Sequence, residues 1–201
     1  MIINKEKISV HLIILTWNNS KILEICLDSI EKIDRNDFKV SIVDNSSSDN
    51  TIEMVSEKFP HYSLIRNSEN LKYAGGYNSA LKQIAFADDE YVILLNDDTI
   101  VSRDFIDELV SPLLNEQKTI ISVPKILYAS NINKIWYAGG NVNLWKGIIS
   151  HVGIRDFDSP KYSFKNETDY ATGCCFCIKY SDLKKLNYFD LSFDMYCEDV
   201  D

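Results

Sequence analysis

Tyr91-Val92-Ile93-Leu94-Leu95-Asn96-Asp97-Asp98-Thr99 is the stretch of sequence that decides the fold. An uninterrupted apolar run of this kind is typical of a strand covered on both faces of a sheet. The run ends in two adjacent carboxylates, whose oxygens are hard ligands suited to Mg²⁺ or Mn²⁺, ions that commonly bridge to diphosphates. The stretch therefore predicts a buried strand whose end presents acidic side chains to a cation and a phosphate.

Two earlier segments repeat the pattern of an apolar strand followed by a polar tip. Val10–Thr16 is β-branched and apolar and runs into Trp17-Asn18-Asn19-Ser20, and residues 39–43 run into the polar residues 44–50. A weaker strand is predicted at residues 62–65, followed by a loop over residues 67–76. Apolar residues at three- and four-residue spacing predict helices between these strands.

This alternation of strands and helices predicts an α/β fold with a mostly parallel sheet that has helices on both faces. Ligands of such sheets sit beyond the carboxyl ends of the strands. The polar tips at residues 16–19, 44–49 and 96–99 are therefore expected to line one cleft.

The later chain has a different texture. A helix is predicted at residues 105–114, a strand at 119–124, a hairpin at 135–149 and a polar loop at 151–169. A further buried strand at residues 174–179 precedes a short helix that begins at Ser181. The whole chain, residues 1–201, is expected to form a single unit.

Composition narrows the class of protein. With 201 residues and 45% hydrophobic content, the chain can bury one substantial core, and a net charge of −9 disfavours a nucleic-acid partner. The five cysteines are odd in number and three crowd into residues 174–178, which indicates reduced, buried thiols. A zinc site is disfavoured because no CxxC pair occurs and only three histidines are present.

No run of about 18 uncharged apolar residues occurs, so no transmembrane segment is predicted in this chain. We expect a cytoplasmic protein, and one at the inner face of the plasma membrane if it is membrane-associated. Peripheral association with a membrane would use another segment or a partner.

Two polar motifs each have two interpretations. Residues 44–49 are consistent with a capped turn, or with Asp44 accepting a hydrogen bond from a pyrimidine ring N–H while Asp49 caps the next helix. Gly75-Gly76 forms either a tight helix entry or a close backbone approach to a phosphate or ribose. No GxGxxG or P-loop pattern occurs, which disfavours a dinucleotide-binding protein.

The acidic residues divide into different candidate roles. Asp98 is the expected direct metal ligand, Asp97 is expected to touch a ribose or to be structural, and Asn96 would be an uncharged ligand or hydrogen-bonding partner. Glu198-Asp199 is either a solvated acidic terminus or a general base. The second interpretation is supported by the aromatic-rich residues 188–196 before it, which should pack and hold the carboxylates in place.

Four motifs in fixed order resemble the family 2 glycosyltransferases of the GT-A fold, especially their rhamnosyltransferase-like branch. They are Thr16-Trp17-Asn18, residues 43–49, Leu95-Asn96-Asp97-Asp98-Thr99 and Glu198-Asp199-Val200-Asp201. Residues 67–70 with Gly75-Gly76-Tyr77-Asn78 resemble the family's nucleotide loop, and Thr172-Gly173-Cys174 resembles its Thr-Gly-small segment. The family normally continues beyond the last motif, so we expect a chain truncated at its C-terminus.

The resemblance implies a role for each matched residue. Thr16, Trp17, Asn18 and Asp44 would contact base and ribose, Asp98 would carry most of the metal binding, and Asp199, with Glu198 as competitor, would be the base. The other nucleotide-sugar-binding residues implied are Asn70, Gly75, Gly76, Asn78, Asn96 and Asp97. Asn96 departs from the family by replacing the first acidic residue of its DXD metal site. Residues 8–116 would form the nucleotide-sugar-binding half and 117–201 an incomplete acceptor-side half.

The function implied is an inverting, Mn²⁺- or Mg²⁺-dependent transfer of a sugar from a UDP- or dTDP-sugar donor. The acceptor would be a hydroxyl of a glycan or lipid-linked glycan in cell-surface polysaccharide synthesis. Trp136 and Trp145 could stack on sugar rings, but we interpret them as packing residues of the predicted hairpin.

Two other functions stay open from the sequence. A nucleotidyltransferase would need a Gly-rich, basic loop after the first strand, where this chain has Thr16-Trp17-Asn18-Asn19. A non-catalytic nucleotide-sugar-binding module is favoured by Asn96 and by the missing C-terminal continuation.

Overall fold

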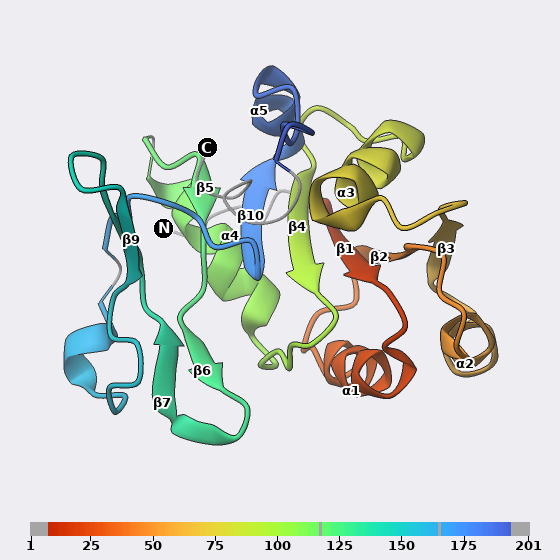
Figure 1. Cartoon of the computed structure of the whole chain (residues 1–201), viewed down its shortest axis with the longest axis horizontal. Coiled ribbons are helices and arrows are strands. Elements are labelled where there is room, and N and C mark those ends of the chain that lie inside the picture. Colours follow the sequence, from red (N-terminus) through yellow and green to blue (C-terminus); the bar gives the residue numbers. More distant parts are fainter. Residues whose placement is uncertain (1–7, 117, 165, 194–201) are drawn as a thin grey trace, which may run out of the picture.

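The computed structural model describes residues 8–116, 118–164 and 166–193 (Figure 1). Its first part contains β1 (Val10–Thr16), α1 (Ser20–Ile30), β2 (Phe38–Asp44), α2 (Thr51–Lys58), β3 (Ser63–Arg66), α3 (Lys72–Gln83), β4 (Tyr91–Asn96) and α4 (Phe105–Asn115). Its later part contains β5 (Ile121–Ser122), β6 (Ile126–Tyr128), β7 (Asn131–Tyr137), β8 (Gly140–Asn143), β9 (Ile148–His151), the 3-10 helix η1 (Pro160–Tyr162), β10 (Cys175–Lys179) and α5 (Tyr180–Lys185). No helix in the described part of the chain is both long and apolar enough to cross a membrane.

A six-stranded sheet with the order β3-β2-β1-β4-β10-β5 forms the centre of the molecule. The strands β3, β2, β1 and β4 run parallel, whereas β10 is antiparallel to both of its neighbours, β4 and β5. Two short hairpins, β6–β7 and β8–β9, stand beside the β5 edge (Figure 1). The prediction of a mostly parallel α/β sheet is confirmed.

The core lies on both faces of the sheet because alternate residues of each strand point to opposite faces. Leu12 and Ile14 of β1 pack with the buried faces of α1, α2 and α4, whereas Ile13 packs with α3 and α5. Both faces of β1 and β4 are therefore covered, which explains why their sequences are continuously apolar.

The predicted elements agree with the structure except at three places. The helix after β3 begins at Lys72, so Gly75 and Gly76 lie in its first turns and not in a loop. The predicted strand at 119–124 is reduced to two residues, and residues 126–151 form two hairpins where one was expected. Gly139 and Gly147 have left-handed backbone angles, with φ of 115° and 60°, and they end the strands there.

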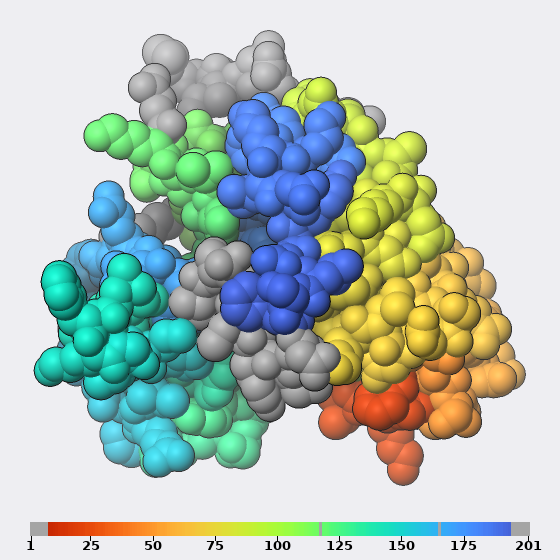
Figure 2. All heavy atoms as spheres, turned by 45° about the horizontal axis from the view of Figure 1, so that its top comes forward, coloured from red at the N-terminus to blue at the C-terminus, as the bar shows by residue number. Residues whose placement is uncertain are grey.

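Segment 180–193 crosses the front of the molecule beside α3 (Figure 2). Phe189 packs its ring against Tyr73 and Tyr77 of α3, with ring centroids 5.5 Å and 6.0 Å apart. This segment therefore carries the chain from the end of α5 along the length of α3.

A buried polar cluster lies near the amino ends of the strands. His11 is 5% exposed, its Nε2 lies 2.9 Å from Ser41 Oγ, and its Nδ1 lies 3.9 Å from an oxygen of Glu90. Glu90 accepts hydrogen bonds from Lys39 Nζ and Ser9 Oγ at 2.9 Å and 3.0 Å. Burial lowers the pKa of His11 to about 4, although the charge of Glu90 opposes this.

Folding should therefore become less favourable in mild acid. Between the ordinary histidine pKa and about 4, the unfolded chain takes up a proton that the folded protein does not, so the free energy of unfolding falls as pH falls. From about pH 7 to about pH 5 this amounts to about 2 kcal/mol. Urea unfolding should show that loss in the unsubstituted protein and less of it in His11→Gln. An equal loss in His11→Gln would contradict the assignment, and His61→Gln, an exposed site, is the matched control.

Candidate functional site

The register of the sheet brings the polar tips of three strands together. Thr16 of β1 is the direct partner of Asp44 of β2, and Leu15 is the partner of Asn96 of β4. Thr16 Oγ1 donates a hydrogen bond of 2.5 Å to Asp97 Oδ2. The tips of β1 and β4 are therefore joined at the carboxyl edge of the sheet, as the sequence predicts.

Asp97 and Asp98 have different environments. Asp97 is half-buried, and burial raises its pKa despite the hydrogen bonds from Thr16 and Asn19, with the charge of Asp98 adding to the rise. Asp98 is exposed, and no ion pair holds it within the described residues. Asp97 therefore joins the two strands, and Asp98 is the carboxylate that is free to bind a ligand.

The surroundings of Asp97 and Asp98 are negatively charged. The pKa of the Cys174 thiol is raised to about 12, mainly by burial and next by the charge of Asp98. Burial is also the main cause that raises the pKa of the Cys26 thiol to about 11, and the charges of Asp97 and Asp98 contribute. A cation bound here would be attracted by these two carboxylates, and within the described part of the chain no ion pair joins either of them to a basic residue.

The residues fit a cation that takes part of its coordination from a substrate. No group of three or more His, Cys, Asp or Glu side chains that could hold a metal occurs in the described ranges. Mg²⁺ is commonly held by one or two carboxylates together with waters and the phosphates of a nucleotide. Asp98 can supply such a carboxylate, and Asp97 and Asn96 adjoin it.

Asn18 locks the loop after β1 to the loop after β2. Its Oδ1 accepts hydrogen bonds from the amides of Ser48 and Asp49, at 2.7 Å and 3.3 Å, and its own amide donates to Ser47 Oγ at 2.8 Å. Asn18 is held with φ of 50°, in the left-handed region that asparagine tolerates better than most residues. The side chain predicted to touch a nucleotide thus also fixes two loops of the site, a role the sequence analysis missed.

Asp49 satisfies the first amides of two helices. Its carboxylate accepts hydrogen bonds from the amide of Thr51 in α2, at 3.1 Å, and from the amide of Ser20 in α1, at 3.3 Å. The contact with α2 was expected and the contact with α1 was not. The sequence could not show it because Ser20 and Asp49 are 29 positions apart.

Asp44 is buried, with no exposed surface, and its carboxylate accepts hydrogen bonds from the amide of Ser47 at 3.1 Å and 3.3 Å. The structure therefore makes it the residue that holds the turn after β2, and a contact with a base stays a prediction. Its neighbour Asn45, which the sequence analysis did not single out, donates from Nδ2 to the Lys72 carbonyl at 2.9 Å and accepts from Asn67 Nδ2 at 2.8 Å. Asn45 thus ties the start of α3 to the edge of the sheet.

The predicted nucleotide loop is explained largely by packing. Asn70 Oδ1 accepts a hydrogen bond of 2.8 Å from the amide of Lys72 as α3 begins. A Cβ on Gly76 would lie 2.5 Å from a methyl carbon of Leu15 and 2.9 Å from Asn45 Nδ2, and one on Gly75 would lie 2.9 Å from Leu71 Cβ. Gly76 therefore allows α3 to lie against β1, and Gly75 leaves room for Leu71 at the start of the helix. The tight helix entry is the interpretation that the structure supports, and contact with a phosphate stays a prediction.

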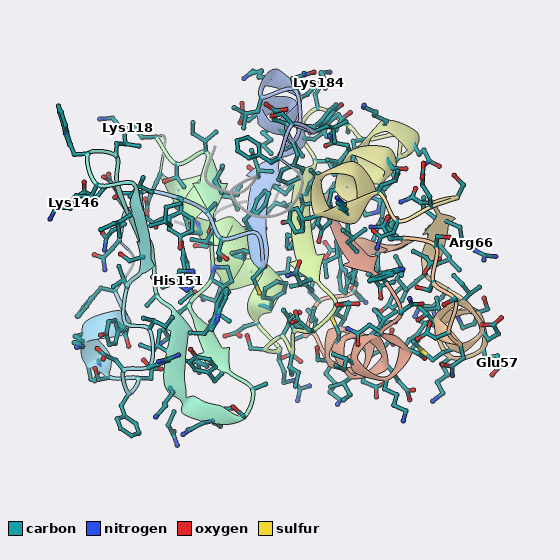
Figure 3. The ribbon with its side chains drawn as sticks, viewed as in Figure 1. Glu57, Arg66, Lys118, Lys146, His151 and Lys184 are labelled. Atoms are coloured by element: carbon teal, nitrogen blue, oxygen red, sulfur yellow. The ribbon has the colours of Figure 1, made fainter. Side chains whose placement is uncertain are left out.

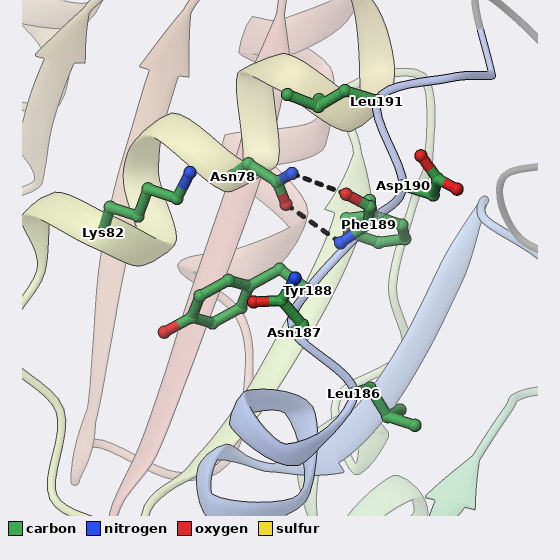
Figure 4. A pocket seen from close by; sticks show the side chains of 8 residues that line it. All are labelled: Asn78, Lys82, Leu186, Asn187, Tyr188, Phe189, Asp190 and Leu191. Atoms are coloured by element: carbon green, nitrogen blue, oxygen red, sulfur yellow. Dashed lines mark hydrogen bonds between the residues drawn. The ribbon is translucent and has the colours of Figure 1, made fainter.

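Asn78 of α3 bonds to the segment that follows α5. Its Nδ2 donates to the Phe189 carbonyl at 2.8 Å and its Oδ1 accepts from the Phe189 amide at 3.1 Å (Figure 4). These bonds border a pocket of about 460 Å³ that lies between α3 and residues 186–191. Of the predicted site residues this pocket includes only Asn78, which holds segment 186–191 through these bonds, and its contact with a nucleotide stays a prediction.

The segment Thr172-Gly173-Cys174 lies beside the end of β4. The Cys174 carbonyl accepts a hydrogen bond of 2.9 Å from the Asn96 amide, and the Gly173 carbonyl accepts one of 2.6 Å from Tyr73 of α3.

Trp17 is 53% exposed on the loop after β1. Glu198 and Asp199, the predicted base and its competitor, lie outside the described residues.

Comparison with known proteins identifies the family of this chain. Residues 11–186 match the family model described as "Glycosyl transferase family 2". Rhamnosyltransferase WbbL of Escherichia coli (strain K12) is 24% identical over 204 residues, which span 96% of this chain and 74% of that protein. The low-salt glycan biosynthesis hexosyltransferase Agl10 of Haloferax volcanii is 29% identical over 161 residues, which span 80% of this chain and 50% of that protein.

A solved structure shows the same fold. The mannosyltransferase PcManGT from Pyrobaculum calidifontis, in complex with GDP-Man and Mn²⁺, superposes with a TM-score of 0.64 at 20% identity, and the match covers 95% of this chain and 49% of that one. The present chain thus spans about half of that protein and of Agl10. Its mostly parallel sheet, flanked by helices, is the GT-A fold. Because the family model covers most of its length, the chain belongs to glycosyl transferase family 2.

Proposed function

We propose that this protein transfers a sugar, with inversion, from a nucleotide diphosphate donor to a hydroxyl of a glycan or lipid-linked glycan during cell-surface polysaccharide synthesis. The observation that supports this most is the hydrogen bond between Thr16 and Asp97, which joins the carboxyl ends of β1 and β4 while Asp98 stays exposed. The structure thus offers one free carboxylate next to three polar strand tips.

In this proposal the donor lies across the tips of β1, β2 and β4. Trp17 is exposed and available to the base, and Asn18 holds the loops after β1 and β2 in one arrangement. Expected donors are UDP- or dTDP-sugars, whereas the mannosyltransferase with the same fold was solved with GDP-Man. Residues 8–116 would form the donor side and 117–201 the acceptor side.

Asp98 would hold Mn²⁺ or Mg²⁺ with the donor diphosphate. When bound, the ion would neutralise the charge that develops on the leaving nucleoside diphosphate. Asp199, or Glu198 in its place, would take the proton from the acceptor hydroxyl as that oxygen attacks the anomeric carbon from the face opposite the leaving group. Asp97 would stay bonded to Thr16 and fix the direction of Asp98.

Product analysis tests the class of reaction. The protein, Mn²⁺ and a nucleotide sugar labelled in the sugar and in the phosphate are incubated with a glycan acceptor. Sugar transfer with release of a nucleoside diphosphate is expected. Formation of a nucleoside triphosphate and a sugar 1-phosphate when pyrophosphate replaces the glycan acceptor would indicate a nucleotidyltransferase, and donor binding without any turnover would indicate a non-catalytic binding module.

The donor can be identified by thermal stability, because a ligand that binds only the native state raises the melting temperature. We expect one or a few nucleotide sugars to raise it with Mn²⁺ present and much less without the ion. At a ligand concentration about a hundredfold above the dissociation constant the stabilisation is about 2.7 kcal/mol. A panel of UDP-, dTDP- and GDP-sugars that gives no metal-dependent shift would contradict the proposal.

A further inference from the structure

The charges of this protein are unevenly distributed along the chain. Residues 117–155 contain none of its 30 acidic residues but five of its 21 basic residues, namely Lys118, Lys125, Lys134, Lys146 and Arg155. The rest of the chain is correspondingly more acidic than the net charge of −9 indicates. An asymmetry of this kind points to a surface that meets an anionic partner.

The same stretch exposes large apolar side chains. Leu144 and Trp145, at the tip of the β8–β9 hairpin, have relative exposures of 87% and 101%. Ile148 and Ile149 follow on β9 and are also exposed, as is Ile132 of β7. Trp145 therefore does not pack in the hairpin, contrary to the sequence-based expectation, whereas Trp136 packs against His151 with ring centroids 4.6 Å apart.

The hairpin is a well-formed support for these side chains. Four residue pairs link β8 and β9, and Gly147 turns the chain at the tip with φ of 60°. Asp169 accepts a hydrogen bond of 2.9 Å from the amide of Val142, and its own amide donates one of 3.1 Å to the Gly140 carbonyl, so that it braces β8. Figure 1 shows the loop at the outer end of the molecule, directed away from the carboxyl end of β4.

Most basic side chains of the stretch keep their charge available. Lys125 pairs with Asp158 at 2.7 Å, and Lys134 lies 5.5 Å from the centre of the Phe157 ring. Within the described ranges no ion pair holds Lys118, Lys146 or Arg155. Lys118 and Lys146 lie toward the same end of the molecule, opposite Arg66 and Glu57 (Figure 3). Basic groups thus accompany the exposed apolar tip.

We propose that residues 118–155 form a docking surface for an anionic lipid bilayer, with Leu144 and Trp145 entering the boundary between headgroups and acyl chains. This departs from the expectation that membrane association would use another segment or a partner. Tryptophan and leucine beside lysine suit that boundary, because the rings and aliphatic groups leave water while the cation meets lipid phosphates. A second copy of the chain would bring like charges together, and a soluble polyanion would leave the apolar tip exposed. Docking at this end would leave the carboxyl edge of the sheet in water.

The test is co-sedimentation with vesicles. We expect the protein to bind phosphatidylcholine vesicles that contain about one third phosphatidylglycerol, to bind pure phosphatidylcholine much less, and to be released as salt rises. The double substitution Leu144→Ser and Trp145→Ser should weaken partitioning about tenfold or more, because two apolar side chains no longer enter the bilayer. Lys146→Glu should weaken it about fivefold or more.

Matched controls lie on the other side of the molecule. Ile25→Ser on α1 removes another exposed apolar side chain, and Lys32→Glu makes the same charge change just beyond α1. Both should bind vesicles like the unsubstituted protein. Circular dichroism of every variant distinguishes loss of docking from loss of folding, and a Leu144/Trp145 variant that is folded yet binds normally would overturn the proposal.

Fluorescence identifies the occupant of the tip. With Trp17→Phe and Trp136→Phe, emission comes from Trp145 alone, and it should shift to the blue and be quenched by brominated lipids in anionic vesicles. Binding to heparin as tight as to vesicles, with no quenching of Trp145, would show a polyanion surface and overturn the proposal. Trp145 already shielded without lipid, in protein that light scattering shows to be self-associated, would assign the surface to a second copy.

Discussion

Asp98→Ala is expected to lower sugar transfer by about a hundredfold to a thousandfold and to abolish the metal dependence of donor binding. The reason is that Asp98 is the exposed carboxylate of the pair, whereas Asp97 is bonded to Thr16. Without it the charge developing on the leaving diphosphate would lose its main counter-charge. Initial rates of sugar transfer and donor titrations with and without Mn²⁺ measure both effects.

The chain offers a matched control near the other end of the same strand. Asp89 is an exposed carboxylate just before β4 begins, at the end opposite Asp98, and Asp89→Ala should leave rate and metal dependence unchanged. Thermal unfolding of Asp98→Ala should resemble that of the unsubstituted protein, because an exposed carboxylate without an ion pair contributes little to stability. If Asp98→Ala kept its turnover and its response to Mn²⁺, the assignment of the metal ligand would be wrong.

Asp199→Asn is expected to lower turnover by about a hundredfold to ten-thousandfold while donor binding stays unchanged. Asparagine keeps the size of the side chain but cannot take a proton from the acceptor hydroxyl. Steady-state kinetics with the glycan acceptor, together with donor titration, separate the two effects, because a loss confined to kcat indicates an interaction made in the transition state.

Glu198→Gln is the companion variant. If Asp199 is the base, Glu198→Gln should keep most of the activity. The reverse result, a fully active Asp199→Asn and an inactive Glu198→Gln, would transfer the role to Glu198. Full activity in both variants would place the base elsewhere in the protein.

The sheet could be predicted from sequence because its strands are buried on both faces. The continuous apolar runs of Val10–Thr16 and Tyr91–Asn96 leave few other structures open, and the polar residues after them must then lie at one edge. The register confirms this, since Thr16 pairs with Asp44 and Leu15 pairs with Asn96. Asp97 and Asp98 were expected to have different roles, and their environments do differ, whereas the binding of a metal by Asp98 stays a prediction.

Contacts between distant residues could not be predicted. Asn78 bonds to Phe189 over 111 positions, so a residue that matches a nucleotide motif also holds a segment of the chain. Gly76 matches the same motif, yet its missing Cβ is explained by Leu15 and Asn45. Exposure at a hairpin tip is also decided by tertiary structure, which is why Trp145 was misinterpreted as a packing residue.

Calorimetric titration of the protein with UDP, dTDP and GDP, each with and without Mn²⁺, tests the central claim most directly. The claim is that the carboxyl edge around Asp98 binds a nucleoside diphosphate through a divalent cation. We predict saturable binding of at least one of these ligands that depends on Mn²⁺ and is lost in Asp98→Ala but kept in Asp89→Ala. Binding that is the same without Mn²⁺, or the same in Asp98→Ala, would contradict the account.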